Sequence, residues 1–109
     1  MNQADENGWT PLFAASHEGH VEAMRVLIKA KAAVDQATND GATPLYIASQ
    51  EGHVNAMQLL IEAKAVVNQA NNNGASPLIV ASHNGHAPAV QVLLEAGACS
   101  AELMFKGNF

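Results

Sequence analysis

Cysteine, aromatic side chains and positive charge are all scarce in this sequence, and each scarcity excludes a class of protein. The single cysteine, Cys99, leaves no pair for a disulfide framework or for the common cysteine-based zinc sites. Aromatic residues make up 5% of the chain although hydrophobic residues make up 49%, so the core must be built from small and medium aliphatic side chains. Such a composition suits short, closely packed helices.

Positive charge is scarce relative to negative charge, because five basic residues oppose ten acidic ones and give a formal charge of −5 at pH 7. Phosphate backbones and anionic membrane surfaces attract proteins through Lys and Arg, so we expect neither nucleic acid nor membrane as a partner. No run approaches the roughly 18 apolar residues of a membrane span, and the N-terminus shows no targeting pattern. We therefore expect an intracellular protein of the cytoplasm.

The sequence does contain an internal repeat with a period of 33 residues. A Gly-x-Thr/Ser-Pro-Leu motif begins at Gly8, Gly41 and Gly74, and a Gly-His pair follows each start at the same distance. Residues 8–40 and 41–73 share 21 identities in 33 positions without a gap. A fixed period of this length indicates stacked units that bury one continuous core. We expect one domain over residues 1–109, consisting of a partial repeat and three repeats with an atypical tail from about residue 99: 1–7, 8–40, 41–73 and 74–106.

Each repeat carries start and stop signals for two short helices. A hydroxyl residue before Pro starts the first helix, because the hydroxyl caps a free N–H and Pro has none, and a glycine ends it. An apolar pattern at i, i+3 and i+4 marks the second helix. These signals predict first helices over about 12–18, 45–51 and 78–84, and second helices over about 22–30, 55–63 and 88–96. Asn-Gly and Asp-Gly pairs between repeats predict hairpin-like fingers with type I′ turns.

The pattern Gly-x-Thr-Pro-Leu-x-x-Ala-x-x-x-Gly-His, followed by a Leu-Leu or Leu-Ile pair, resembles the ankyrin repeat. The resemblance covers residues 8 to about 98 and implies an all-α ankyrin-repeat solenoid of stacked helix-turn-helix units. The chain departs from the family pattern at two positions of the repeat. The His that usually follows Thr-Pro-Leu is Phe13, Tyr46 or Ile79, and the Gly that usually follows the second helix is Lys31 or Lys64.

The resemblance also implies a protein-binding scaffold, with a concave groove formed by the finger tips and the first helices. Positions on these segments vary between repeats while the packing positions recur. We predict a protein-binding site made of Trp9, Phe13, His17, Glu18, Asp40, Tyr46, Gln50, Glu51, Ile79, His83 and Asn84. Trp9, Phe13 and His17 lie four residues apart and should form one column, with Trp9 as the main anchor. Phe13 and Tyr46 either contact the partner or pack beside the stacking residues. The mixture of aromatic and acidic residues favours a basic or mixed-charge protein segment with apolar side chains.

Catalytic and metal-binding interpretations find little support. His17 and His20 are three residues apart with Gly19 between them, whereas a zinc-binding His-Glu-x-x-His motif needs two histidines four apart on one helix. The His of the Gly-His pair recurs in every repeat, which favours a structural hydrogen bond. Phosphate-binding glycine loops and nucleophile elbows are also missing. We expect no enzymatic activity, no cofactor and no metal.

The two ends of the array raise the question of what covers them, because a repeat protein needs polar outer faces. Residues 99–109 abandon the repeat pattern and include the large apolar residues Leu103, Met104 and Phe105. These residues either plug the last repeat or form an exposed end, and an exposed end would support weak self-association. A second interpretation is that the chain is a structural excerpt of a longer array whose binding surface lies elsewhere.

Overall fold

The computed structural model describes residues 2–98, so Cys99 and the apolar tail lie outside the described residues. Residues 2–98 form six helices and no strand, and none of these helices is long and apolar enough to cross a membrane. The helices are α1 (Pro11–Glu18), α2 (Val21–Lys29), α3 (Pro44–Glu51), α4 (Val54–Glu62), α5 (Pro77–His83) and α6 (Ala87–Glu95). The predicted all-α fold is confirmed.

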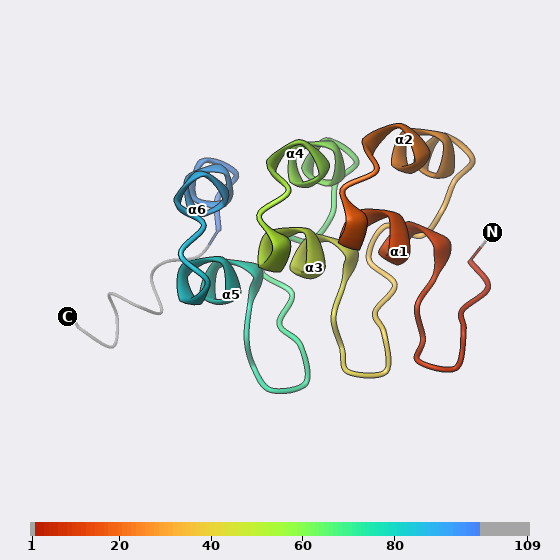
Figure 1. Ribbon diagram of the computed structural model, residues 1–109, viewed down its shortest axis with the longest axis horizontal. Coiled ribbons are helices and arrows are strands. Elements are labelled where there is room, and N and C mark those ends of the chain that lie inside the picture. The colour runs from red at the N-terminus through yellow and green to blue at the C-terminus, as the bar shows by residue number, and fades with distance from the viewer. Residues whose placement is uncertain (1, 99–109) are drawn as a thin grey trace.

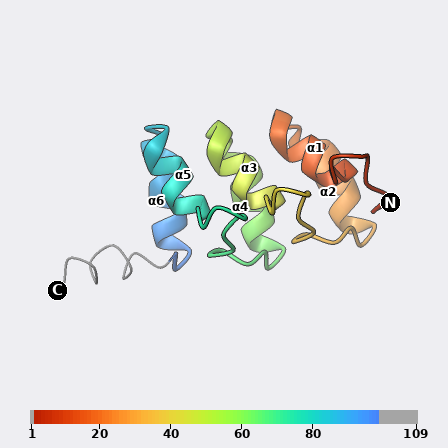
Figure 2. The ribbon, with the colours of Figure 1, turned by 90° about the horizontal axis from the view of Figure 1, so that it is seen from below.

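The helices pair into three stacked units, which we call repeat 1 (α1 and α2), repeat 2 (α3 and α4) and repeat 3 (α5 and α6). Figure 1 shows α1, α3 and α5 in one row, α2, α4 and α6 in a second row, and the connecting loops projecting from the first row. Figure 2 shows the same three pairs side by side along the long axis. The molecule measures 44 × 25 × 21 Å, an elongated shape in which each repeat packs against its neighbours.

The first helices begin where the sequence predicts. Thr10, Thr43 and Ser76 each accept a hydrogen bond on the side-chain oxygen from the backbone N–H three residues later, at 3.1 or 3.2 Å. The Pro that follows each cap occupies the first helical turn, where no N–H is required. Gly19 and Gly52 end α1 and α3 with φ of 74° and 73°, as expected for left-handed caps.

The fingers (residues 5–9, 38–42 and 71–75) do not contain the predicted type I′ turns. Within the fingers only the glycines have positive φ, because Lys31 and Lys64 are the sole non-glycine residues with positive φ within residues 2–98. In the second finger the Gly41 N–H donates to the Thr38 carbonyl at 2.9 Å, and the Thr38 N–H donates to the Ala42 carbonyl at 2.9 Å. The turn is therefore centred one residue earlier than predicted, and the glycine occupies its final, left-handed position.

Neighbouring fingers are joined by a ladder of hydrogen bonds with the period of the repeat. The Asn39 side-chain amide donates to the Glu6 carbonyl at 2.9 Å, and the Asn72 amide donates to the Asn39 carbonyl at 3.0 Å. The backbone N–H groups of Asn39 and Asn72 donate to Asn7 and Asp40 at 3.1 and 3.0 Å. These bonds fix the spacing of the fingers without a β-sheet.

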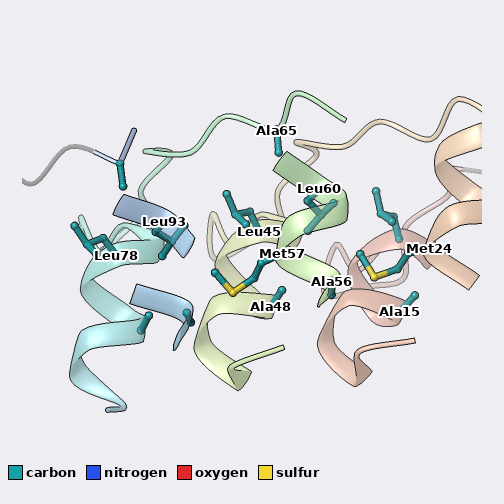
Figure 3. Packing of buried hydrophobic residues seen from close by; sticks show 14 of the residues in the cluster. Ala15, Met24, Leu45, Ala48, Ala56, Met57, Leu60, Ala65, Leu78 and Leu93 are labelled. Carbon is teal, nitrogen blue, oxygen red and sulfur yellow. The ribbon is translucent and has the colours of Figure 1, made fainter. Parts of the chain in front are cut away.

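The main core lies between the two helix rows and consists of small and medium aliphatic residues. Figure 3 shows Ala48, Met57 and Leu60 packed between neighbouring repeats, and all three are fully buried. Alanines at recurring positions let the first helices approach closely, while Met and Leu fill the layers between repeats. The composition of the core therefore agrees with the prediction from the low aromatic content.

Two of the recurring histidines join one repeat to the next. Nε2 of His53 donates to the carbonyl of His17 at 3.1 Å, and Nε2 of His86 donates to the carbonyl of Gln50 at 2.9 Å. A Cβ atom on Gly19 would lie 2.8 Å from the His53 ring, so glycine is required there for close approach. The predicted structural role is confirmed for these two histidines.

Candidate protein-binding surface

The predicted site residues lie on the fingers and on α1, α3 and α5, and we call this side of the molecule the finger–helix surface. The predicted column of Trp9, Phe13 and His17 is present at the N-terminal end of this surface. The ring centroids of Trp9 and Phe13 are 4.7 Å apart in an edge-on arrangement, and those of Trp9 and His17 are 5.3 Å apart. Phe13 and His17 are four residues apart and share one face of α1, and Trp9, in the finger just before this helix, packs against both rings.

The aromatic residues of the finger–helix surface differ in how far their rings are exposed to solvent. Phe13 is 2% exposed and Tyr46 is 8% exposed, and both belong to a small cluster with Ile47. Each ring is therefore largely covered by the repeats themselves, and only its edge toward the neighbouring cleft is open. Trp9 packs against this cluster but remains partly exposed. These two rings belong to the packing that supports Trp9.

A cleft with a volume of about 400 Å³ lies between the fingers and α1 and α3. Five of the predicted residues line it, namely Trp9, Phe13, Asp40, Tyr46 and Gln50. The sequence analysis missed the contribution of Asn71, Asn72 and Asn73, which form the wall on the third finger. Their place in the repeat was a usable signal, because Asn73 stands one period after Asp40.

Tyr46 and Asn71 connect the floor of the cleft to this wall. The side-chain amide of Asn71 donates to the phenol oxygen of Tyr46 at 3.2 Å. Burial raises the pKa of the Tyr46 phenol above its ordinary value, because the phenolate would lose hydration in this position. The phenol therefore remains a neutral polar group at the base of the cleft.

The ends of α1 and α3 carry a group of acidic and polar side chains. Nδ1 of His17 lies 2.9 Å from a carboxylate oxygen of Glu18, and its Nε2 lies 3.9 Å from a carboxylate oxygen of Glu51. The side-chain amide of Gln50 also donates to Glu51 at 3.0 Å. His17 thus stands between two carboxylates from neighbouring repeats.

The remaining predicted residues lie on repeat 3. Ile79 is 39% exposed, and His83 and Asn84 are also exposed. The side-chain amide of Asn84 donates to the Gln50 carbonyl at 3.1 Å, so this residue takes part in joining repeat 3 to repeat 2. The described structure therefore leaves Ile79 as the apolar residue of the predicted set that is most open to solvent.

Positive charge is confined to one side of the described chain, whereas acidic residues lie on both sides. Within residues 2–98, the cations of Lys and Arg all lie in α2 or directly after α2 and α4: Arg25, Lys29, Lys31 and Lys64. The finger–helix surface carries acidic residues from the fingers and from the ends of α1 and α3: Asp5, Glu6, Glu18, Asp40 and Glu51. In this part of the chain the only salt bridge of a Lys or Arg side chain is that of Arg25 with Glu22 at 3.4 Å.

The described residues contain no group of three or more His, Cys, Asp or Glu side chains that could hold a metal ion. His17 directs its two ring nitrogens to different carboxylates. The two carboxylates therefore lie on different sides of the ring, and these three side chains do not converge on one point as metal ligands would.

Paired helices stacked in a row and joined by projecting fingers define a helical repeat protein. The model of ankyrin repeats, in three copies, matches residues 1–71 and 38–104, and the chain belongs to the ankyrin-repeat family. No curated protein matches the sequence. Ankyrin repeats are generally protein–protein interaction modules and are typically not enzymes.

Proposed function

We propose that the finger–helix surface binds a partner protein through a basic or mixed-charge segment that also carries apolar side chains. The confinement of Lys and Arg to the other side of the described chain is the observation that carries this proposal. Glu18, Asp40 and Glu51 lie on a surface to which the described chain contributes no Lys or Arg. Such a surface attracts positive segments and disfavours acidic ones, because unpaired like charges oppose docking.

Trp9 supplies the apolar part of the proposed site. Its ring is partly exposed and rests against Phe13 and His17, so little conformational freedom remains to be lost when a partner binds. Tryptophan is also enriched among residues that dominate binding energies. The adjoining cleft of about 400 Å³ gives room for an apolar side chain beside the Asp40 carboxylate.

The test begins with a partner captured from a lysate, reduced to the shortest binding segment and studied as a synthetic peptide by calorimetry. We expect Trp9→Ala combined with Glu51→Lys to weaken binding by about 2 kcal/mol or more, roughly 30-fold in Kd. Arg25→Ala, on the opposite side of the repeat, is the control and should leave Kd unchanged. Thermal unfolding of each variant checks that the fold is retained.

The two substitutions of the double variant should change the salt dependence of Kd in different ways. Glu51→Lys should reduce the dependence of Kd on salt, because exposed charges are screened by ions. Trp9→Ala should lower affinity by a similar factor at low and high salt. If Arg25→Ala abolishes binding and the double variant binds normally, the site lies on the opposite side. A spacer role alone predicts that no captured segment responds to either substitution.

A further inference from the structure

Among residues 2–98, nothing covers the outer face of repeat 3 in the way that the following repeat covers the same face of repeats 1 and 2. Ser16 and Ser49 are 0% exposed because the following repeat packs over them, whereas Ser82, one period later, is exposed. Met57 is 0% exposed, whereas its equivalent Val90 is partly exposed. The repeats thus provide an internal comparison, and they show that this face is built to be covered.

The uncovered face is hollowed and apolar. A hollow of about 630 Å³ is lined by Ala87, Val90 and Leu94, with Ser82, Gly85, Gln91 and Glu95 around them. Leu94 is 45% exposed. Figure 1 shows that α5 and α6 end their two helix rows, with no further helix beyond them among the described residues. Apolar side chains left open in a hollow of this kind favour a contact that removes them from water.

The sequence after residue 98 has apolar residues at positions where the fingers have polar ones. Continuing the period would make residues 99–109 a further finger. At the finger positions of Asn71 and Asn72, however, this segment has Met104 and Phe105. Asn72 is exposed in its finger, so a finger of the same geometry would hold a large apolar ring in water. The segment therefore needs an apolar surface that a finger does not provide.

We propose that residues 99–109 fold back on the same chain and cover the outer face of repeat 3, with Leu103 and Phe105 in the hollow beside Val90 and Leu94. The N–H of Ala98 donates to the Leu93 carbonyl at 2.8 Å, so the described chain ends beside α6. Five to seven further residues reach roughly 17 to 24 Å at about 3.4 Å per residue. This reach is comparable with the 25 × 21 Å cross-section of the molecule.

Tethering favours this occupant over a second copy of the chain. Charge does not separate the two, because Glu102 offsets Lys106 within the segment and a second copy carries the same segment. A short tether holds the segment near the face at an effective concentration in the mM range. A second copy reaches such a concentration only in very concentrated solution.

The experiment uses the full chain, with carbon-13 labels on the methyl groups, and nuclear magnetic resonance. We expect nuclear Overhauser effects between the Phe105 ring and the methyl groups of Val90 and Leu94. Leu103→Asp with Phe105→Asp removes the ring itself, so the informative result for this variant is a shift of the Val90 and Leu94 methyl signals. Ala101→Asp with Asn108→Asp adds the same charge to the same segment and should leave the contacts in place.

Two results would overturn this inference. In the first, the unsubstituted chain shows no contact between the Phe105 ring and either methyl-bearing residue. In the second, the contacts appear only as protein concentration rises and are seen between differently labelled chains, which assigns the face to a second copy. Neither result bears on the finger–helix surface, so the proposed function is tested separately.

Discussion

At the scale of single residues, Lys31 and Lys64 show how surrounding structure imposes a backbone conformation. Their φ values are 74° and 73°, in the left-handed region that Gly97 occupies in repeat 3 with φ of 90°. The Lys31 N–H donates to the Ile28 carbonyl at 2.9 Å, and the next N–H, of Ala32, donates to the Leu27 carbonyl at 3.0 Å. These two bonds hold the lysine in a conformation that L-residues adopt at a cost of about 1 to 2 kcal/mol.

Replacing either lysine by glycine should therefore stabilise the protein. We expect Lys31→Gly and Lys64→Gly each to raise the free energy of unfolding by about 0.5 to 1 kcal/mol, since the relief of strain exceeds the entropy that glycine adds to the unfolded chain. Urea unfolding measures the change. Lys29→Gly is the matched control, because Lys29 is helical and glycine there should destabilise by about 1 kcal/mol. Equal losses at Lys29 and Lys31 would contradict the strained conformation.

Tyr46 permits a second residue-scale prediction because it is the only tyrosine in the chain. Burial raises the pKa of its phenol in the folded protein, so the folded phenol should ionise at higher pH than the phenol of the chain unfolded in urea. Ultraviolet absorbance of the phenolate measures both titrations. Identical midpoints would show that the ring is hydrated.

The sign of the linked effect on stability follows from this shift. Both states hold the proton below the unfolded pKa of about 10, and the unfolded state loses it first as the pH rises. The free energy of unfolding should therefore fall as the pH rises past about 10. Tyr46→Phe should remove this part of the pH dependence, and it would also remove the hydrogen bond from Asn71.

At the scale of helices and turns, local sequence signals predicted where the first helices begin but did not predict the turn type of the fingers. A hydroxyl residue before Pro fixed each first helix because the cap and the missing N–H act within one turn. The finger turns were misassigned because Asn-Gly suits more than one turn type. In the second finger the register depends on the Thr38 hydroxyl, which accepts hydrogen bonds from the Asp40 and Ala42 N–H groups at 3.3 and 3.2 Å.

The caps should account for a measurable part of the stability. Thr43 is 1% exposed and accepts the Tyr46 N–H at 3.1 Å, so Thr43→Ala would leave a buried donor without a partner. We expect a loss of about 1 to 2 kcal/mol in the free energy of unfolding, measured with urea. Thr43→Ser keeps the hydroxyl, as Ser76 does in repeat 3, and should recover most of this loss. A serine variant as unstable as the alanine variant would assign the effect to lost packing.

The candidate site was predictable where it depends on spacing along one short segment. Phe13 and His17 share a face of α1 because they are four residues apart, and Trp9 reaches them from the finger just before the helix. The burial of Phe13 was not predictable from that spacing, because it depends on a cluster that includes Ile47 of α3 and Val80 of α5. Contacts between repeats decide exposure, and the period alone does not reveal which variable positions they cover.

At the scale of the whole molecule, stacking makes the middle repeat the most enclosed part of the described chain. Helix α3 lies between α1 and α5, and six of its eight residues are buried. Helix α6 contacts its own repeat and α4, and only Ala89 and Leu93 are buried within it. Since each repeat contacts only its neighbours, local stability should vary along the array.

Hydrogen exchange should therefore rank the helices by their place in the array. We expect the slowest amide exchange in α3 and faster exchange in α2 and α6, because regions with fewer buried contacts open at lower free-energy cost. Met57→Ala removes a fully buried side chain from the middle layer and should destabilise by about 2 to 5 kcal/mol, with faster exchange in all three repeats. Leu103→Asp with Phe105→Asp should instead accelerate exchange in α5 and α6 alone if the tail covers the last face. Equal exchange in α3 and α6, with every helix accelerated alike by both changes, would show that the three repeats open as one unit and that no gradient exists.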